Sequence, residues 1–113
     1  MNDFFTAFRL TNANEGGYSA DPNDAGGETY QGISRRYFPN WEGWSTIDLY
    51  KPLHQGAMIK DDSLDCMVEN FYRENFWNKI GGDNLDNQDL ANQCYDTAVN
   101  MGVGEALKLL GQS

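Results

Sequence analysis

Glu15 stands directly before Gly16 and Gly17, where a helical pattern of apolar residues ends. The C-terminal end of a helix carries partial negative charge, which disfavours a carboxylate. Partial burial among aromatic side chains has the same effect, so both favour a carboxyl group that keeps its proton. Such a group can act as a general acid near neutral pH. The alternative interpretation is a surface glutamate that precedes a helix end.

The residues after Glu15 are candidates for binding a substrate. Gly16 and Gly17 allow a sharp backbone turn and the close approach of a bulky ligand. Tyr18 and Tyr30 carry rings that can stack on the faces of sugars. The alternative for both tyrosines is that they pack as hairpin residues against helices.

Asp24 and Thr29 provide further polar groups in the same stretch. Asp24 lies nine residues after Glu15. A glycosidase needs a second group opposite its acid, either a base for water or a nucleophile. Thr29 is a candidate for holding that water. The alternatives are that Asp21 and Asp24 are turn residues, which hydrogen-bond locally, and that Thr29 is a β-branched strand residue.

A calcium-binding loop is the main competitor for this stretch. Counted from Asp21, Asn23 and Gly26 match the third and sixth positions of such a loop. Ala25 and Gly32 occupy the fifth and twelfth positions, where ligands are required. The missing bidentate ligand argues against a metal site, and we predict neither a metal nor an organic cofactor.

Other catalytic arrangements find little support. His54 is the only histidine, and Cys66 and Cys94 lie in no CxxC or Cys/His spacing typical of zinc. We interpret the cysteines as buried thiols on helix faces, and two positions do not decide whether they pair. Without a Ser, Cys or His set for acyl transfer, a peptidase or amidase is disfavoured.

The elements that must position these residues follow from apolar spacing and from Gly and Pro. Asn2 or Asp3 can cap the first helix, and Asp62 or Ser63 a later one. The order predicts an α+β fold, mainly α, with a small β-hairpin after the first helix. We expect helices over 2–14, 34–37, 62–77, 87–101 and 105–110, a hairpin over 18–33, a loop with two tryptophans over 40–46, and a short helix or turn over 47–55.

Bulk properties restrict the partners. The chain has 113 residues, which suits one domain over 1–113, and its net charge of −9 disfavours nucleic-acid binding. No segment has the roughly 20 apolar residues of a membrane span, and the N-terminus does not resemble a signal peptide. We expect a protein made in the cytoplasm.

The stretch EGGYSADPNDAGGETYQGIS, residues 15–34, resembles the opening motif of glycoside hydrolase family 108. The segments ENFYRENFW and LANQCYDTAVNMGVGEALKLL resemble helices of that family. Its members are N-acetylmuramidases of lysozyme-like fold, among them proteins labelled secretion activators and phage endolysins. They usually continue into a peptidoglycan-binding region, which we expect to be absent here because the chain stops at Ser113.

The resemblance implies cleavage of the β-1,4 bond between N-acetylmuramic acid and N-acetylglucosamine. The family's catalytic glutamate falls on Glu15. The order of Glu15, Asp24 and Thr29 is also similar to that of phage lysozymes, although Thr29 comes one residue sooner. The expected partners are peptidoglycan strands and subunits of a virion or secretion complex, with release through a holin or a secretion system.

Our interpretation is therefore a muramidase in which Glu15 protonates the leaving oxygen and Asp24, helped by Thr29, positions or activates water. Two alternatives remain. One is a lytic transglycosylase with a single acid/base, and the other is a non-catalytic wall-binding or virion structural protein.

Overall fold

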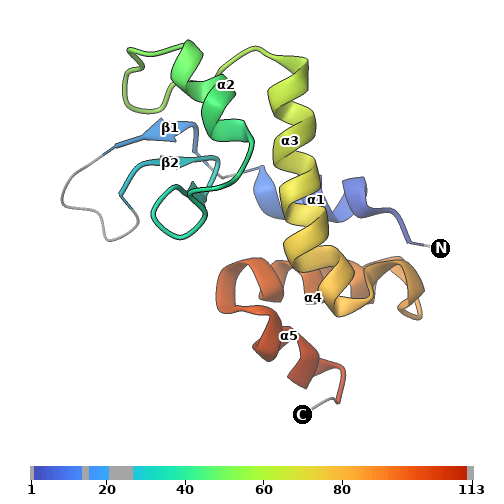
Figure 1. Cartoon of the computed structure of the whole chain (residues 1–113). Coiled ribbons are helices and arrows are strands. Elements are labelled where there is room, and N and C mark those ends of the chain that lie inside the picture. Colours follow the sequence, from blue (N-terminus) through green and yellow to red (C-terminus); the bar gives the residue numbers. More distant parts are fainter. Residues whose placement is uncertain (1, 14–15, 21–26, 112–113) are drawn as a thin grey trace. The chain divides into compact units, whose positions relative to one another are not determined.

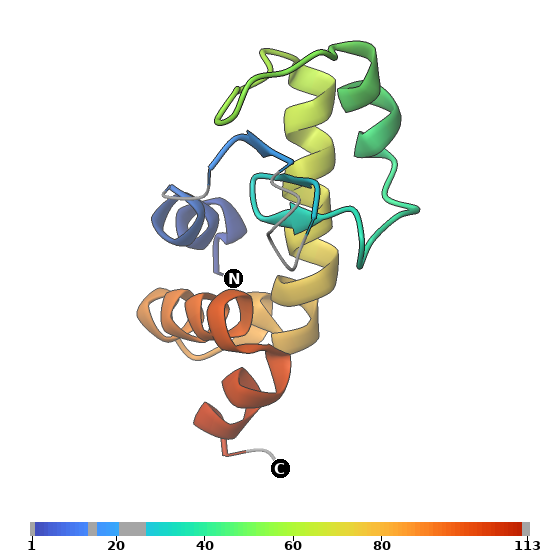
Figure 2. The ribbon, with the colours of Figure 1, turned by 90° about the vertical axis from the view of Figure 1, so that its left-hand side faces the viewer.

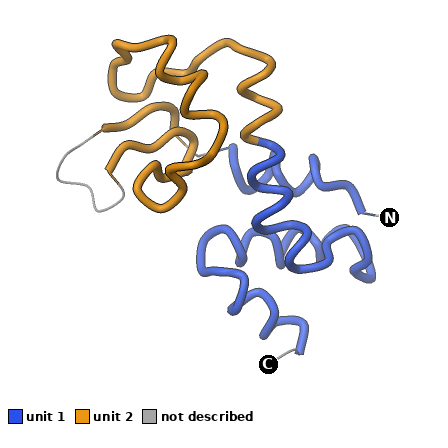
Figure 3. Tube along the Cα trace, viewed as in Figure 1, with its two compact units in different colours: residues 1–13, 69–113 blue, residues 14–68 orange. Residues whose placement is uncertain are grey.

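The computed structural model describes residues 2–13, 16–20 and 27–111. The described chain is mainly helical, with a three-stranded antiparallel sheet near its N-terminus, as the sequence predicted (Figure 1). Two compact units divide it: unit 1 is Met1–Ala13 with Glu69–Ser113, and unit 2 is Asn14–Val68 (Figure 3). The single catalytic domain expected from the sequence stays a prediction.

Unit 1 is built from helices. Helix α3, Asp62–Tyr72, begins in unit 2, and its last residues belong to unit 1. The other helical segments of unit 1 are α1 Phe4–Asn12, η1 Arg73–Trp77, η2 Asn78–Ile80, η3 Gly82–Asn84, α4 Gln88–Met101 and α5 Val103–Leu109. Helix α4 packs against α1 and α5 (Figure 2).

Capping residues set the helix ends, with Asp3 capping α1 as predicted. For α3 the prediction of Asp62 or Ser63 was wrong: the helix begins at Asp62, and the Asp61 carboxylate before it accepts from the Leu64 N–H at 3.1 Å. The Asp3 carboxylate accepts from the Phe5 N–H at 3.1 Å, and the Asn87 side chain accepts from the Leu90 N–H at 2.8 Å. Gly102, with φ of 102°, ends α4. Helix α1 ends at Asn12, with Ala13 as its C-cap residue.

Aromatic side chains fill the core of unit 1. The ring of Phe4 meets those of Trp77 and Tyr95 edge-on, with centroids 5.6 and 5.7 Å apart. The apolar face of α4 is buried at Ala91, Cys94, Tyr95 and Ala98. The Tyr95 hydroxyl donates to the Asn12 Oδ1 at 2.7 Å, which fixes the end of α1 on α4.

Unit 2 contains the sheet. Strand β1, Tyr18–Ser19, pairs with β2, Thr29–Tyr30, which pairs with β3, Ile33–Ser34. The sequence predicted the first pair but missed β3. Gln31 and Gly32, with φ of 47° and 84°, make the tight turn that joins β2 to β3.

Several predicted helices differ from the structure. The helix expected over 62–77 is α-helical to Tyr72 and continues as the π-helical η1, and α5 begins at Val103 rather than at 105. Residues 35–37 form a turn rather than a helix, in which the Ser34 hydroxyl accepts from the Tyr37 N–H at 3.4 Å. Helix α2, Gly43–Leu49, begins inside the expected loop because Trp44 is an anchor that is only 2% exposed. It therefore starts before the predicted helix or turn over 47–55.

Both cysteines are free thiols. Cys94 is buried as predicted, and burial raises the pKa of its thiol. Cys66 is exposed on α3, which corrects the expectation that both are buried.

Candidate active site

The predicted site residues fall in the first part of unit 2. Glu15, Asp21 and Asp24 lie outside the described residues, as do three positions of the rejected calcium loop, Asn23, Ala25 and Gly26. The catalytic assignments of Glu15 and Asp24 stay predictions. The described candidates are Gly16, Gly17, Tyr18, Thr29 and Tyr30.

Gly17 is held against backbone of the same unit. An added Cβ would overlap the carbonyl oxygen of Ala57 and lie 2.7 Å from that of Gly56. Next to it, the Tyr18 N–H donates to the Ala57 oxygen at 2.8 Å, and the Gly56 N–H donates to the Tyr18 oxygen at 2.7 Å. Gly17 is therefore required by a close backbone approach. An added Cβ at Gly16 would meet nothing within 4 Å.

The two tyrosines lie on neighbouring strands and are largely covered. Tyr18 is 8% exposed and Tyr30 is 0% exposed. The Tyr30 hydroxyl oxygen accepts a hydrogen bond from the Ile59 N–H at 3.1 Å, so the hydroxyl group is hydrogen-bonded within unit 2. Both rings are thus largely covered in this structure, and their assignment to sugar binding stays a prediction.

Thr29 lies in the middle strand of the sheet. It pairs with Ser19 of β1 and with Ser34 of β3, and its side chain is partly exposed. Side chains alternate along a strand, so Thr29 projects to the face opposite that of Tyr30. A partly exposed hydroxyl on a firmly paired strand can hold a water molecule.

Glu28, just before Thr29, is the centre of a cluster that the sequence did not predict. The Tyr18 hydroxyl donates to its Oε2 at 2.6 Å, Arg35 Nη1 lies 3.1 Å from its Oε1, and Lys51 Nζ contacts its Oε2. Arg35 also forms a two-pronged pair with Asp48, at 2.8 and 2.9 Å. Lys51 Nζ lies 2.8 Å from Asp48 as well.

Charge pairing keeps both carboxylates of this cluster ionised. Burial alone would raise the pKa of Glu28, but hydrogen bonds from Lys51, Tyr18 and Arg35 outweigh it and lower that pKa. Hydrogen bonds from Arg35 and Lys51 hold the pKa of Asp48 far below its usual value. Glu28 is thus an unsuitable proton donor or base, because its carboxylate is ionised and already bound by Tyr18, Arg35 and Lys51.

Sequence reasoning missed this cluster because only one of its pairs is local. Asp48 and Lys51 are three residues apart, a spacing at which helical side chains meet. Glu28, Arg35 and Tyr18 come from separate segments of the sheet and its turns. The charges of Glu28 and Arg35 indicate that each forms an ion pair, but their positions in the sequence do not indicate with which residues.

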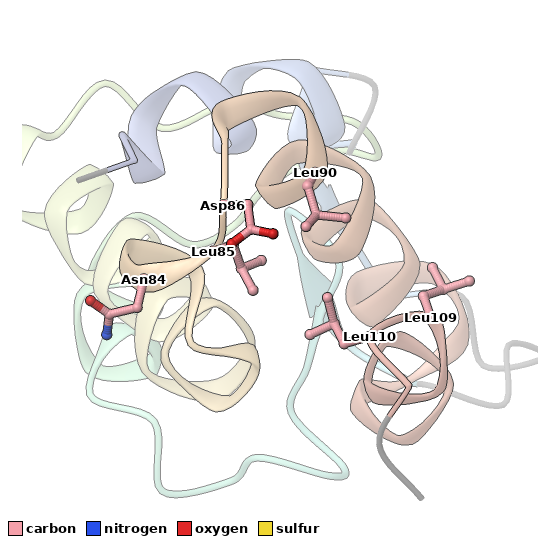
Figure 4. Close-up of a pocket in the computed structure, with 6 residues that line it drawn as sticks. All are labelled: Asn84, Leu85, Asp86, Leu90, Leu109 and Leu110. Atoms are coloured by element: carbon pink, nitrogen blue, oxygen red, sulfur yellow. The ribbon is translucent and has the colours of Figure 1, made fainter.

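A surface pocket of about 350 Å³ lies in unit 1 (Figure 4). It is lined by Asn84, Leu85, Asp86, Leu90, Leu109 and Leu110. Asp86 is the one carboxylate among the described residues that line it, whereas glycoside hydrolysis usually uses a pair of carboxyl groups. This pocket therefore does not match the chemistry expected of the site.

The described ranges contain no group of three or more His, Cys, Asp or Glu side chains arranged to hold a metal ion. In the same ranges, none of the helices combines the length and the apolar character that a membrane crossing requires.

Residues 8–102 match the family model described as Glycosyl hydrolase 108. This range spans most of the chain and includes Glu15, Asp24, Thr29 and the Glu28 cluster. The chain therefore belongs to glycosyl hydrolase family 108, a lysozyme-like family, which confirms the resemblance seen in the sequence.

Among solved structures, the chain is similar to SagA from Brucella abortus. The two are 30% identical in sequence and superpose with a TM-score of 0.58. The match covers 95% of this chain and 56% of the SagA chain, so this chain corresponds to little more than half of that protein. No curated protein matches it.

Proposed function

We propose that this protein is an N-acetylmuramidase that hydrolyses the β-1,4 bond between N-acetylmuramic acid and N-acetylglucosamine in peptidoglycan. The observation that carries the proposal is family membership over residues 8–102, a range that holds the whole motif EGGYSADPNDAGGETYQGIS. The family implies a polysaccharide substrate. The choice of peptidoglycan as the substrate rests on the lysozyme-like family and on the order of Glu15, Asp24 and Thr29 in the sequence.

The proposed mechanism needs an acid and a group that directs water. Glu15 donates its proton to the glycosidic oxygen as the bond to that oxygen breaks and positive charge develops on the sugar ring. Asp24 takes a proton from a water molecule, or orients it, on the opposite face, with Thr29 holding that water. The water oxygen bonds to the anomeric carbon, which leaves two sugar chains with free ends.

A lytic transglycosylase remains the second candidate within the same family of reactions. Such an enzyme uses one acid/base and closes an internal bond within the muramic acid in place of adding water. Its product is therefore lighter than the hydrolysis product by one water. A scaffold that binds the wall without cleaving it is the third candidate.

Mass spectrometry of purified peptidoglycan after incubation with the protein separates the three. Free reducing ends at muramic acid support hydrolysis, and anhydro ends support transglycosylation. Absence of any product, with binding retained, supports the non-catalytic scaffold. Glu15→Gln is the matched control, because it removes the acidic proton and changes little volume.

We also propose where the protein acts and with what. It works at the bacterial cell wall. There it is part of a larger assembly, such as a virion or secretion complex, or it acts beside a separate wall-binding subunit. It reaches the wall through a holin or a secretion system. The support is its charge of −9, which gives no attraction to an anionic wall.

A further inference from the structure

Glu28, the residue directly before β2, is held by contacts to both its side chain and its backbone. Its carboxylate accepts a hydrogen bond from Tyr18 and pairs with Arg35 and Lys51. Its backbone oxygen accepts from the Arg35 N–H at 2.8 Å. The side chain is only 19% exposed, so both its backbone and its side chain are fixed within unit 2.

The residue on the other side of Thr29 is fixed as well. Tyr30 is completely buried, and its hydroxyl oxygen accepts from the Ile59 N–H. Glu28 directly precedes β2, and within that strand Thr29 projects to the face opposite that of Tyr30. Thr29 therefore sits between two anchored neighbours, which restrict how its backbone can rotate.

The cluster around Glu28 is suited to this task because its charges balance. Two carboxylates, Glu28 and Asp48, face two cations, Arg35 and Lys51, so no charge is left uncompensated in a partly buried place. Arg35 also lies over the ring of Trp44, 5.2 Å from its centroid. The Arg35 guanidinium is thus held by Asp48 and by the Trp44 ring, and its contact with Glu28 restricts the motion of the Glu28 carboxylate.

We propose that Glu28, held by Tyr18, Arg35 and Lys51, is a positioning residue that sets the orientation of Thr29. This inference rests on the hydrolase activity proposed above, in which the Thr29 hydroxyl holds the attacking water. Glu28 itself touches no reacting atom. It acts through the strand, by keeping one rotamer of its neighbour in place.

The test uses Tyr18→Phe, which keeps the ring and removes the hydroxyl that donates to Glu28. We expect kcat on peptidoglycan to fall roughly tenfold with KM little changed, since displacement of a positioned group costs turnover more than binding. Tyr37→Phe is the matched control, because Tyr37 is 67% exposed in the same unit, and its kcat should equal that of the unaltered protein.

A double-mutant cycle separates positioning from general loosening of the fold. Thr29→Val removes the hydroxyl but keeps the branched shape. If Tyr18 and Glu28 act through Thr29, Tyr18→Phe costs no further turnover in the Thr29→Val protein. If the two losses multiply, or if Tyr18→Phe alone leaves kcat unchanged, the proposal is overturned.

A second measurement does not depend on activity. Three-bond NMR couplings report the χ1 angle of Thr29, and we expect a single rotamer in the unaltered protein and averaged values in Tyr18→Phe and Glu28→Gln. Unaltered couplings in both variants overturn the proposal even if the protein cleaves peptidoglycan. A protein that forms no product refutes the proposed function, while the couplings still decide whether Glu28 positions Thr29.

Discussion

The carbonyl group of Ala57 lies against the α-carbon of Gly17, and it occupies the space that any side chain at position 17 would need. The second glycine of the EGG motif therefore has a structural cause. It lets β1 and residues 56–57 exchange two backbone hydrogen bonds at Tyr18.

Gly17→Ala should destabilise the protein by about 1–3 kcal/mol, because the new methyl group forces backbone apart in a packed region. Gly16→Ala is the matched control, since its added Cβ meets nothing within 4 Å, and it should change the free energy of unfolding by less than about 0.5 kcal/mol. Urea denaturation of both variants measures the difference. Equal stabilities would contradict the close approach at Gly17.

Asp24→Asn should lower kcat strongly and leave substrate binding nearly intact, because it removes the proposed base and keeps its shape. The rate of release of reducing ends measures kcat, and sedimentation with insoluble peptidoglycan measures binding. An unchanged rate would return Asp24 to the role of a turn residue.

The stereochemistry of the product depends on the distance between the two carboxyl groups. We expect inversion of configuration if the Glu15 and Asp24 carboxyls stand more than about 6.5 Å apart, and retention at about 5–5.5 Å.

Acid should weaken unit 2 through Asp48 and Glu28. Their pKa values are lower in the folded protein than in the unfolded chain, so their pairing stabilises the fold above about pH 4.5 and is lost as the pH falls through the folded values. Asp48→Asn should reduce the dependence of the melting temperature on pH below about 4.5. Thermal denaturation between neutral and acidic pH tests this.

The control for that experiment is Glu105→Gln in unit 1. Glu105 pairs with Lys108 at 3.2 Å, but both side chains are about half exposed or more, so the pair contributes little. Its melting curve should follow that of the unaltered protein at every pH. If Asp48→Asn follows that curve too, the cluster does not contribute to acid sensitivity.

Tyr95→Phe should cost about 1–3 kcal/mol of folding free energy, because it removes the buried hydroxyl that donates to Asn12. Among the described residues the Asn12 Nδ2 has no hydrogen-bond partner, so the bond to the Asn12 Oδ1 is the one that holds this amide within those ranges. Denaturant unfolding measures the loss, and Tyr37→Phe, at an exposed tyrosine, should show none. If Tyr95→Phe leaves the free energy of unfolding unchanged, the hydrogen bond between Tyr95 and Asn12 makes no net contribution to stability.

Raising the salt concentration should speed, or at least not slow, cleavage of intact walls by the isolated protein. Unit 1 carries four Lys and Arg against eight Asp and Glu, and unit 2 four against nine, so both repel an anionic polymer. Screening over about 10 Å at 0.1 M salt weakens that repulsion. The effect should shrink on short neutral oligosaccharides, which serve as the control substrate.

A steep fall of wall cleavage with salt would indicate attraction by a local basic surface. It would remove the main support for an assembly or a separate wall-binding subunit. The same titration on both substrates distinguishes this outcome from a general effect of salt on the enzyme.

The amino-acid sequence by itself indicated helices α1, α3, α4 and α5 and the family to which the chain belongs. Asn87 and Gly102 mark the two ends of α4, and Asp3 marks the start of α1, because capping bonds and apolar spacing are local properties. The family motif is equally local, since it occupies one continuous stretch of residues 15–34.

Only the tertiary structure decided what surrounds that motif. Strand β3 depends on the Gln31–Gly32 turn, a pair of residues with a weaker turn signal than Asn-Gly. The need for glycine at position 17 arises from Ala57, and the role of Glu28 arises from Tyr18, Arg35 and Lys51. These contacts join segments that are apart in the chain, and neither residue type nor local spacing specifies which of several possible partners each group meets.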